Sequence, residues 1–78
     1  MKMSMENTAA VIAMPSLTGA LQGEALLQSS GFYARVIKLP AGATKKGCAY
    51  GIEVDARIID HAASILDDRR IRRGELLL

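Results

Sequence analysis

The residues with the most chemistry to offer lie in the stretch TKKGCAYGIEV, Thr44 to Val54, which contains the single cysteine of the chain, Cys48. Lys45, Lys46 and a glycine precede the thiol, and an alternating run of residues follows it. Positive charge beside a thiol lowers its pKa below the free value of about 8.5 and favours the nucleophilic thiolate. The stretch therefore predicts a working sulfur atom, although a free cysteine is also commonly a small buried hydrophobe.

The sequence does not contain the residue sets of the other common kinds of site, such as a zinc site or a phosphate-binding loop. A zinc site needs three or four ligands, and this chain has one cysteine and one histidine, His61, which we expect at the surface. The segment GATKKG does not have the spacing of a phosphate-binding loop. One cysteine forms no internal disulfide. We therefore expect no metal and no cofactor.

The length limits the chain to one domain with a thin core. A chain of 78 residues buries only about 60% of the surface that its unfolded form exposes, which leaves little room for a deep active-site cleft and favours an accessory protein over a self-sufficient enzyme. The net charge of +2 indicates no particular partner. No stretch has the length of a signal peptide's apolar core or of a membrane span, and a cytoplasmic location is expected.

Apolar periodicity and turn residues predict a flexible tail over residues 1–7 and a single domain over residues 8–78. Pro15 ends the first strand, Ser16 can cap the first helix, and Asp55 can cap the second. The predicted strands cover residues 8–14, 32–39, 48–54 and part of 71–78, and the predicted helices cover residues 17–29 and 55–69.

The face that each element buries follows from the same pattern. In the third strand, Cys48 is expected on one face with Tyr50, Ile52 and Val54. Each helix has an apolar arc, and the second is the cleaner. The arcs consist of Leu17, Ala20, Leu21, Ala25 and Leu27 in the first helix and of Ile58, Ile59, Ala62, Ile65 and Leu66 in the second.

The order β-α-β-β-α-β predicts an α+β, ferredoxin-like fold, with two helices on one face of a four-stranded antiparallel sheet. Right-handed crossovers then place the first and third strands side by side. Cys48 would lie at one pole with Lys45, Lys46 and the first turn of helix one, including Ser16 and Thr18. The same pole would receive four arginines, Arg69, Arg70, Arg72 and Arg73. Cations at a helix C-terminus also favour its dipole without any ligand.

The chain resembles the Putative Se/S carrier protein-like family, a group of short domains of unknown function. The resemblance covers MPSLTGAL, with hydroxyls at Ser16 and Thr18, then GFYARVIKLP, and then KKGCAYGIEVD, with Cys48 on the family's cysteine and Asp55 on its acidic helix cap. Two positions depart from the family pattern: Ala49 replaces the glycine after the cysteine, and Ala41 follows Pro40 in place of an arginine.

This resemblance implies a role in moving sulfur or selenium between proteins. Cys48 would accept the atom from a donor such as a cysteine desulfurase and pass it to an acceptor protein, whose own thiol completes the exchange. Lys45, Lys46, Ser16 and Thr18 would stabilise the anion, and the four arginines would contact the partner.

Two other functions are compatible with the same pattern. The chain could be an interaction module that dimerises through its open sheet face, where Ala49 and Gly51 allow close approach, with a structural Cys48. RNA-recognition domains share the element order, but KGCAYGIE matches their signature only in part, and the first strand has no aromatic residue. We expect neither specific nucleic-acid binding nor membrane association.

Overall fold

The computed structural model describes residues 9–77. The predicted tail, residues 1–7, lies outside the described residues. The elements in chain order are β1 (Ala9–Met14), α1 (Leu17–Ser29), β2 (Arg35–Lys38), β3 (Tyr50–Asp55), a 3₁₀ helix η2 (Ala56–Ile58), α2 (Ile59–Asp68) and β4 (Leu76–Leu77). Within this part of the chain, no helix is both long and apolar enough to cross a membrane.

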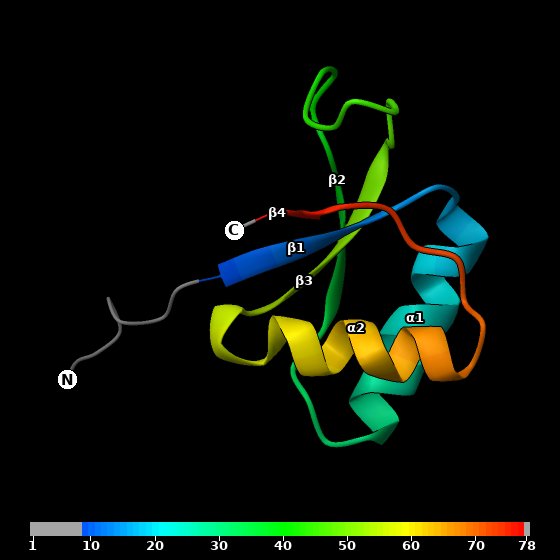
Figure 1. The fold of residues 1–78 in the computed structure, drawn as a ribbon, viewed down its shortest axis with the longest axis vertical. Helices are drawn as coiled ribbons and strands as arrows, with labels where there is room; N and C mark the ends of the chain where they lie inside the picture. Colours follow the sequence, from blue (N-terminus) through cyan, green and yellow to red (C-terminus); the bar gives the residue numbers. More distant parts are fainter. Residues whose placement is uncertain (1–8, 78) are drawn as a thin grey trace, which may run out of the picture.

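The four strands form one antiparallel sheet in the order β2-β3-β1-β4, and both helices cover one of its faces (Figure 1). The predicted ferredoxin-like arrangement is confirmed, including the central pair of β1 and β3. In that pair Met14 lies opposite Tyr50 and Ala10 lies opposite Val54. The end of β1 and the start of β3 therefore meet at one edge of the domain.

Alternate residues of the central strands face the helices and make the core. Ile12 and Met14 from β1 and Ile52 and Val54 from β3 have no exposed surface. From the helices, α2 contributes Ile59, Ala62 and Leu66, and α1 contributes Ala20 and Leu27. Burying one such aliphatic side chain stabilises the fold by about 1.5–3 kcal/mol, so the loss of any one of them would be felt in a chain this small.

Two strands begin later than the sequence indicates. Residues 30–32 complete the end of α1, because the amides of Gly31 and Phe32 donate to the carbonyls of Gln28 and Leu27; β2 therefore starts at Arg35, not at residue 32. β3 starts at Tyr50 and excludes Cys48, whose N–H donates to the Thr44 side chain instead of to a neighbouring strand. Placing Cys48 inside the third strand was therefore wrong.

The last strand is short but its pairing continues beyond it. β4 contains only Leu76 and Leu77, which pair with Ile12 and Val11. Beside them, Ala13 donates to the carbonyl of Glu75 and accepts from the amide of Gly74 at 2.6 Å. The chain from Gly74 onward therefore lies along β1, and Arg72 and Arg73 lie in the connection before it.

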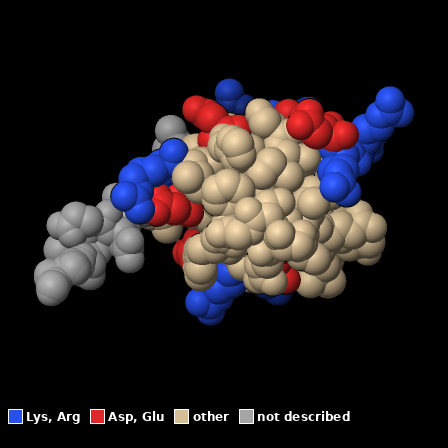
Figure 2. Space-filling view, turned by 90° about the horizontal axis from the view of Figure 1, so that it is seen from below, with Lys and Arg blue, Asp and Glu red and all other residues tan. Residues whose placement is uncertain are grey.

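The buried face of α1 differs from the predicted arc. Leu17 and Leu21 are 42% and 49% exposed. Ala25 is exposed too, whereas Ala20 and Leu27 are buried as predicted, and Gly23, which the arc did not include, is buried with them. A Cβ atom on Gly23 would lie 2.6 Å from Cδ1 of Ile52, so the helix packs against the sheet through a position without a side chain. Leu17 and Leu21 therefore add apolar side chains to the surface. Figure 2 shows one face of the molecule, a broad surface without Lys, Arg, Asp or Glu side chains and with charged groups at its margins.

Replacing Gly23 by alanine tests this close approach. A helical alanine gains about 1 kcal/mol over glycine, whereas overpacking a filled core costs about 1–3 kcal/mol. The added methyl would meet Ile52 and, at 3.1 Å, Leu66, both fully buried. We expect Gly23→Ala to lower the free energy of unfolding by up to about 2 kcal/mol in urea denaturation. Ala25→Gly, on the exposed side of α1, measures the propensity term alone. An increase in stability on Gly23→Ala would contradict this packing.

The second helical segment begins at an acidic cap, as predicted. A side-chain oxygen of Asp55 accepts the backbone N–H of Arg57 at 2.9 Å, and the Arg57 guanidinium pairs with the same carboxylate at 2.6 Å. Hydrogen bonds from the Arg57 side chain and backbone lower the pKa of Asp55 from 3.8 to about 2. The carboxylate therefore stays ionised in the folded chain at pH values where it is protonated in the unfolded one.

A depressed pKa makes a contribution to stability that depends on pH. The Asp55 contribution is present above about pH 4 and is lost as the pH falls towards 2, through the folded-state pKa. We expect Asp55→Asn to lower the urea midpoint at pH 5 and the difference from wild type to shrink between pH 4 and pH 2. Salt at pH 5 should shrink the difference too, because the Arg57 side chain is 83% exposed. A difference that stays constant from pH 5 to pH 2 would show that ionisation plays no part.

Candidate functional site

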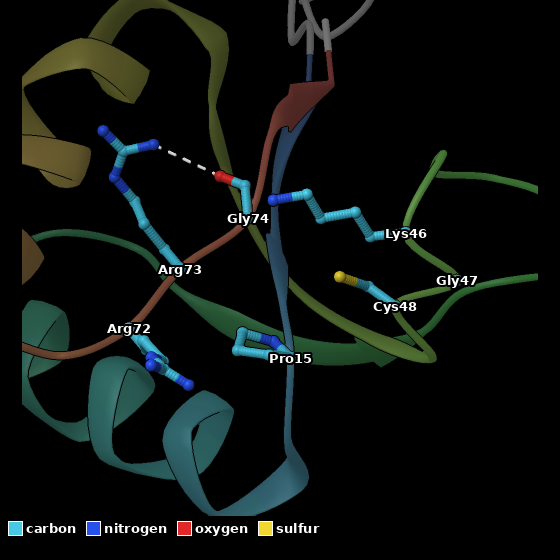
Figure 3. Close-up of a pocket in the computed structure, with 7 residues that line it drawn as sticks. All are labelled: Pro15, Lys46, Gly47, Cys48, Arg72, Arg73 and Gly74. Atoms are coloured by element: carbon cyan, nitrogen blue, oxygen red, sulfur yellow. Dashed lines mark hydrogen bonds between the residues drawn. The ribbon is translucent and has the colours of Figure 1, made fainter.

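A pocket of about 490 Å³ opens where the end of β1, the start of β3 and the connection before β4 meet. Figure 3 shows the residues that line it, and each of these three segments contributes. They are Pro15 after β1, Lys46, Gly47 and Cys48 from the loop before β3, and Arg72, Arg73 and Gly74 from the connection. Of the residues predicted to gather at this pole, four line the pocket: Lys46, Cys48, Arg72 and Arg73.

Cys48 is half-buried and its sulfur lies against the backbone of the final segment. A Cβ atom on Gly74 would lie 3.2 Å from Sγ of Cys48 and 3.3 Å from the carbonyl oxygen of Ala13. Glycine at position 74 thus gives the sulfur room beside β1. Gly74 is a site residue that the sequence pattern did not indicate.

One hydrogen bond joins the two ends of the loop that presents Cys48, and another lies inside the loop. The Leu39 amide donates to the carbonyl of Ala49 at 2.8 Å and so continues the pairing of β2 with β3. Inside the loop, Thr44 Oγ1 accepts the N–H of Cys48 at 2.8 Å. Gly47, directly before the thiol, has φ of +74°, a conformation that favours glycine. Thr44 was not among the predicted site residues.

The four predicted arginines divide into different roles. Arg73 is committed to structure: its guanidinium pairs with Asp67 at 2.9 Å and donates to the Gly74 carbonyl at 3.2 Å, pointing away from the sulfur (Figure 3). Arg72 is exposed at the margin of the pocket. Arg69 and Arg70 close α2 and do not line the pocket. The charge available near Cys48 is therefore smaller than the sequence indicated.

The predicted groups of the loop and the first helix also divide. Lys46 lines the pocket and extends in the same direction as Cys48, whereas Lys45 is exposed outside it. Ser16 acts as the helix cap, accepting the N–H of Gly19 at 3.0 Å. Thr18 is exposed and lies outside the pocket lining. The segment before α1 reaches the pocket through Pro15, which has no N–H to offer an anion.

Tyr50, the aromatic residue on which an RNA-binding platform would depend, is half-buried and packs against the core on the helix side of the sheet. It does not offer a ring on the open face, where RNA-recognition domains stack bases. His61, the only histidine, is exposed and its ring lies 5.3 Å from that of Phe32. Among residues 9–77, no group of three or more His, Cys, Asp and Glu side chains is placed to hold a metal ion.

The pocket brings one nucleophilic group, the Cys48 thiol, together with positive charge, an arrangement that suits nucleophilic sulfur chemistry. The thiol borders a pocket to which Lys46 and Arg72 bring exposed positive charge. An exposed charge pair is worth at most about 1 kcal/mol, so any stabilisation that these two cations give to an anion in the pocket is small.

The sequence profile of the Putative Se/S carrier protein-like family matches residues 9–76, which include every residue of the pocket and all elements of the described fold except the last residue of β4. Comparisons with curated proteins and with solved structures give no match.

The neighbouring lysines allow a matched test of the local charge. Lys46→Gln removes a cation from the pocket, and Lys45→Gln removes one beside it. We expect Lys46→Gln to slow alkylation of Cys48 by iodoacetamide at pH 7 by up to about fivefold, the equivalent of the ~1 kcal/mol that an exposed charge pair is worth. Lys45→Gln should have a smaller effect. Equal rates for both variants and the wild type would remove the lysines from the mechanism.

Proposed function

The chain belongs to the Putative Se/S carrier protein-like family, and on this premise we propose that it carries sulfur or selenium on Cys48 between partner proteins. The observation that carries the proposal is the position of the only thiol at a pocket that Lys46 and Arg72 also line. A persulfide or selenide on cysteine is anionic, so the charge of the pocket suits the loaded form as well as the thiolate.

The transfer consists of two exchanges with no outside oxidant. The Cys48 thiolate attacks the outer sulfur of a donor persulfide, such as that of a cysteine desulfurase. A new S–S bond forms on Cys48, the donor's S–S bond breaks, and its electron pair leaves with the donor thiolate. An acceptor thiolate then attacks the outer sulfur, and Cys48 departs as a thiolate. Selenium in the outer position follows the same course.

Each remaining predicted residue has a proposed part that its position sets. Lys46 is the main anion-stabilising group, and Lys45 acts from the same loop. Ser16 and Thr18 act indirectly, through the first turn of α1. Arg72 would meet a partner at the margin of the pocket. Arg69 and Arg70 are exposed after α2 and would contact a partner whose surface extends from the pocket to the end of that helix.

The face of the sheet that the helices leave uncovered favours a second function, a dimerising module with a structural Cys48. Val11 and Ile37 are half-buried and lie on that face by strand alternation, as does Gly51 between them. Such a module would not need an accessible thiol. The two functions therefore differ in whether Cys48 reacts in the folded protein.

Loading with sulfur tests the carrier function directly. The chain, a cysteine desulfurase and free cysteine are incubated together, and intact mass is measured before and after a thiol acceptor is added. We expect a gain of one sulfur atom that the acceptor removes, and none in Cys48→Ser. Alkylation of the folded chain by iodoacetamide serves as the control for access. A thiol that reacts only after unfolding would refute the carrier function and leave the dimerising module.

A further inference from the structure

We infer that Thr44 is a positioning residue for the Cys48 thiol. Thr44 is 6% exposed, and it is the only polar residue in the buried set of the described chain. Its neighbours Lys45, Lys46 and Gly47 are all exposed. A buried hydroxyl in an otherwise exposed loop needs a hydrogen bond to offset the loss of water, and the one it has is with Cys48.

Thr44 accepts two hydrogen bonds from the backbone at and directly before the thiol. Its Oγ1 accepts the N–H of Cys48 at 2.8 Å, and its backbone carbonyl accepts the N–H of Gly47 at 3.3 Å. The left-handed conformation of Gly47 lets both amides point back toward Thr44. Together these bonds fix the orientation of the last loop residues before the sheet pairing resumes at Ala49.

The orientation matters because the pocket has little tolerance around the sulfur. Cys48 Sγ lies where a single added carbon on Gly74 would be 3.2 Å away. The loop also contributes Lys46, two residues before the thiol, to the pocket. Without the hydrogen bonds to Thr44, the thiol could turn away from Gly74 and from this charge. The core would stay intact, because it is built from other elements.

A comparison of two alkylating reagents reports the electrostatic surroundings of the thiol. Positive charge near a reaction site raises the local concentration of an anionic reagent. Iodoacetate should therefore react faster relative to iodoacetamide at Cys48 than at the cysteine of the unfolded chain. This rate ratio, taken at fixed ionic strength, depends on where the thiol lies and cancels differences in its intrinsic nucleophilicity.

The matched variants are Thr44→Val, which keeps the shape and removes the acceptor, and Thr44→Ser, which keeps the acceptor. We expect Thr44→Val to lower the ratio at least about twofold, toward that of the unfolded chain, and Thr44→Ser to retain the wild-type ratio. Circular dichroism and urea midpoints confirm the fold of each variant. An unchanged ratio in folded Thr44→Val would overturn the inference.

Two further outcomes are decisive. If Thr44→Val does not fold, Thr44→Ala, which adds no bulk to the loop, carries the same expectation, and failure of both to fold would assign Thr44 to folding and overturn the inference. The purpose of placing the thiol in this way rests on the proposed carrier function, but the ratio of alkylation rates can be measured whether or not the protein carries sulfur. A ratio that falls in Thr44→Val while the wild type takes up no sulfur would sink the carrier function alone.

Discussion

The antiparallel pairing of β1 with β3 is the interaction on which the rest of the structure depends. Because Met14 lies opposite Tyr50, the residue that leaves β1 and the loop that enters β3 must meet at one edge of the domain. The same strand, β1, then receives the final segment on its other side through Ala13. Three parts of the chain far apart in sequence are therefore brought to one place by the two neighbours of β1, and the thiol lies where they meet.

Glycine is what lets such a small chain pack its layers closely. Gly23 brings α1 close to Ile52 of the sheet, and Gly74 lets the last segment pass beside the sulfur of Cys48. Both positions remove side chains at contacts where bulk would separate the layers. Small core residues such as Ala20 and Ala62 have the same effect between helices and sheet. The core is thin because few large side chains are buried. Each contact in it therefore contributes a large share of the stability.

The element order, the strand neighbours and the apolar arc of α2 could be predicted from the sequence because each depends on local periodicity and on general rules of connection. The face of α1 could be predicted only in part: Ala20 and Leu27 were in the predicted arc, but Gly23 was not, because a glycine is a weak point in a helix until its neighbour Ile52 is known. The role of Arg73 was hidden as well, since its partner Asp67 lies across a turn. Cys48 read as part of a strand because alternation extends to it, whereas the Thr44 hydroxyl competes for its N–H. In each case the missed feature is a contact between two residues whose spacing in the sequence does not follow a helix or strand repeat.

The modest charge of the pocket is consistent with what a carrier requires. Arg73 is paired with Asp67, so Lys46 and Arg72, both exposed, are the unpaired cations among the described residues that line the pocket. Each such interaction in contact with water is worth at most about 1 kcal/mol. An atom that must be accepted and then released gains nothing from tight stabilisation on the carrier, because every increment that favours loading opposes discharge. Under the proposed function, fixed placement of the sulfur by the loop, by Gly74 and by Thr44 would help both directions of exchange equally. Position, more than charge, would then be the contribution that this fold makes to the chemistry of Cys48.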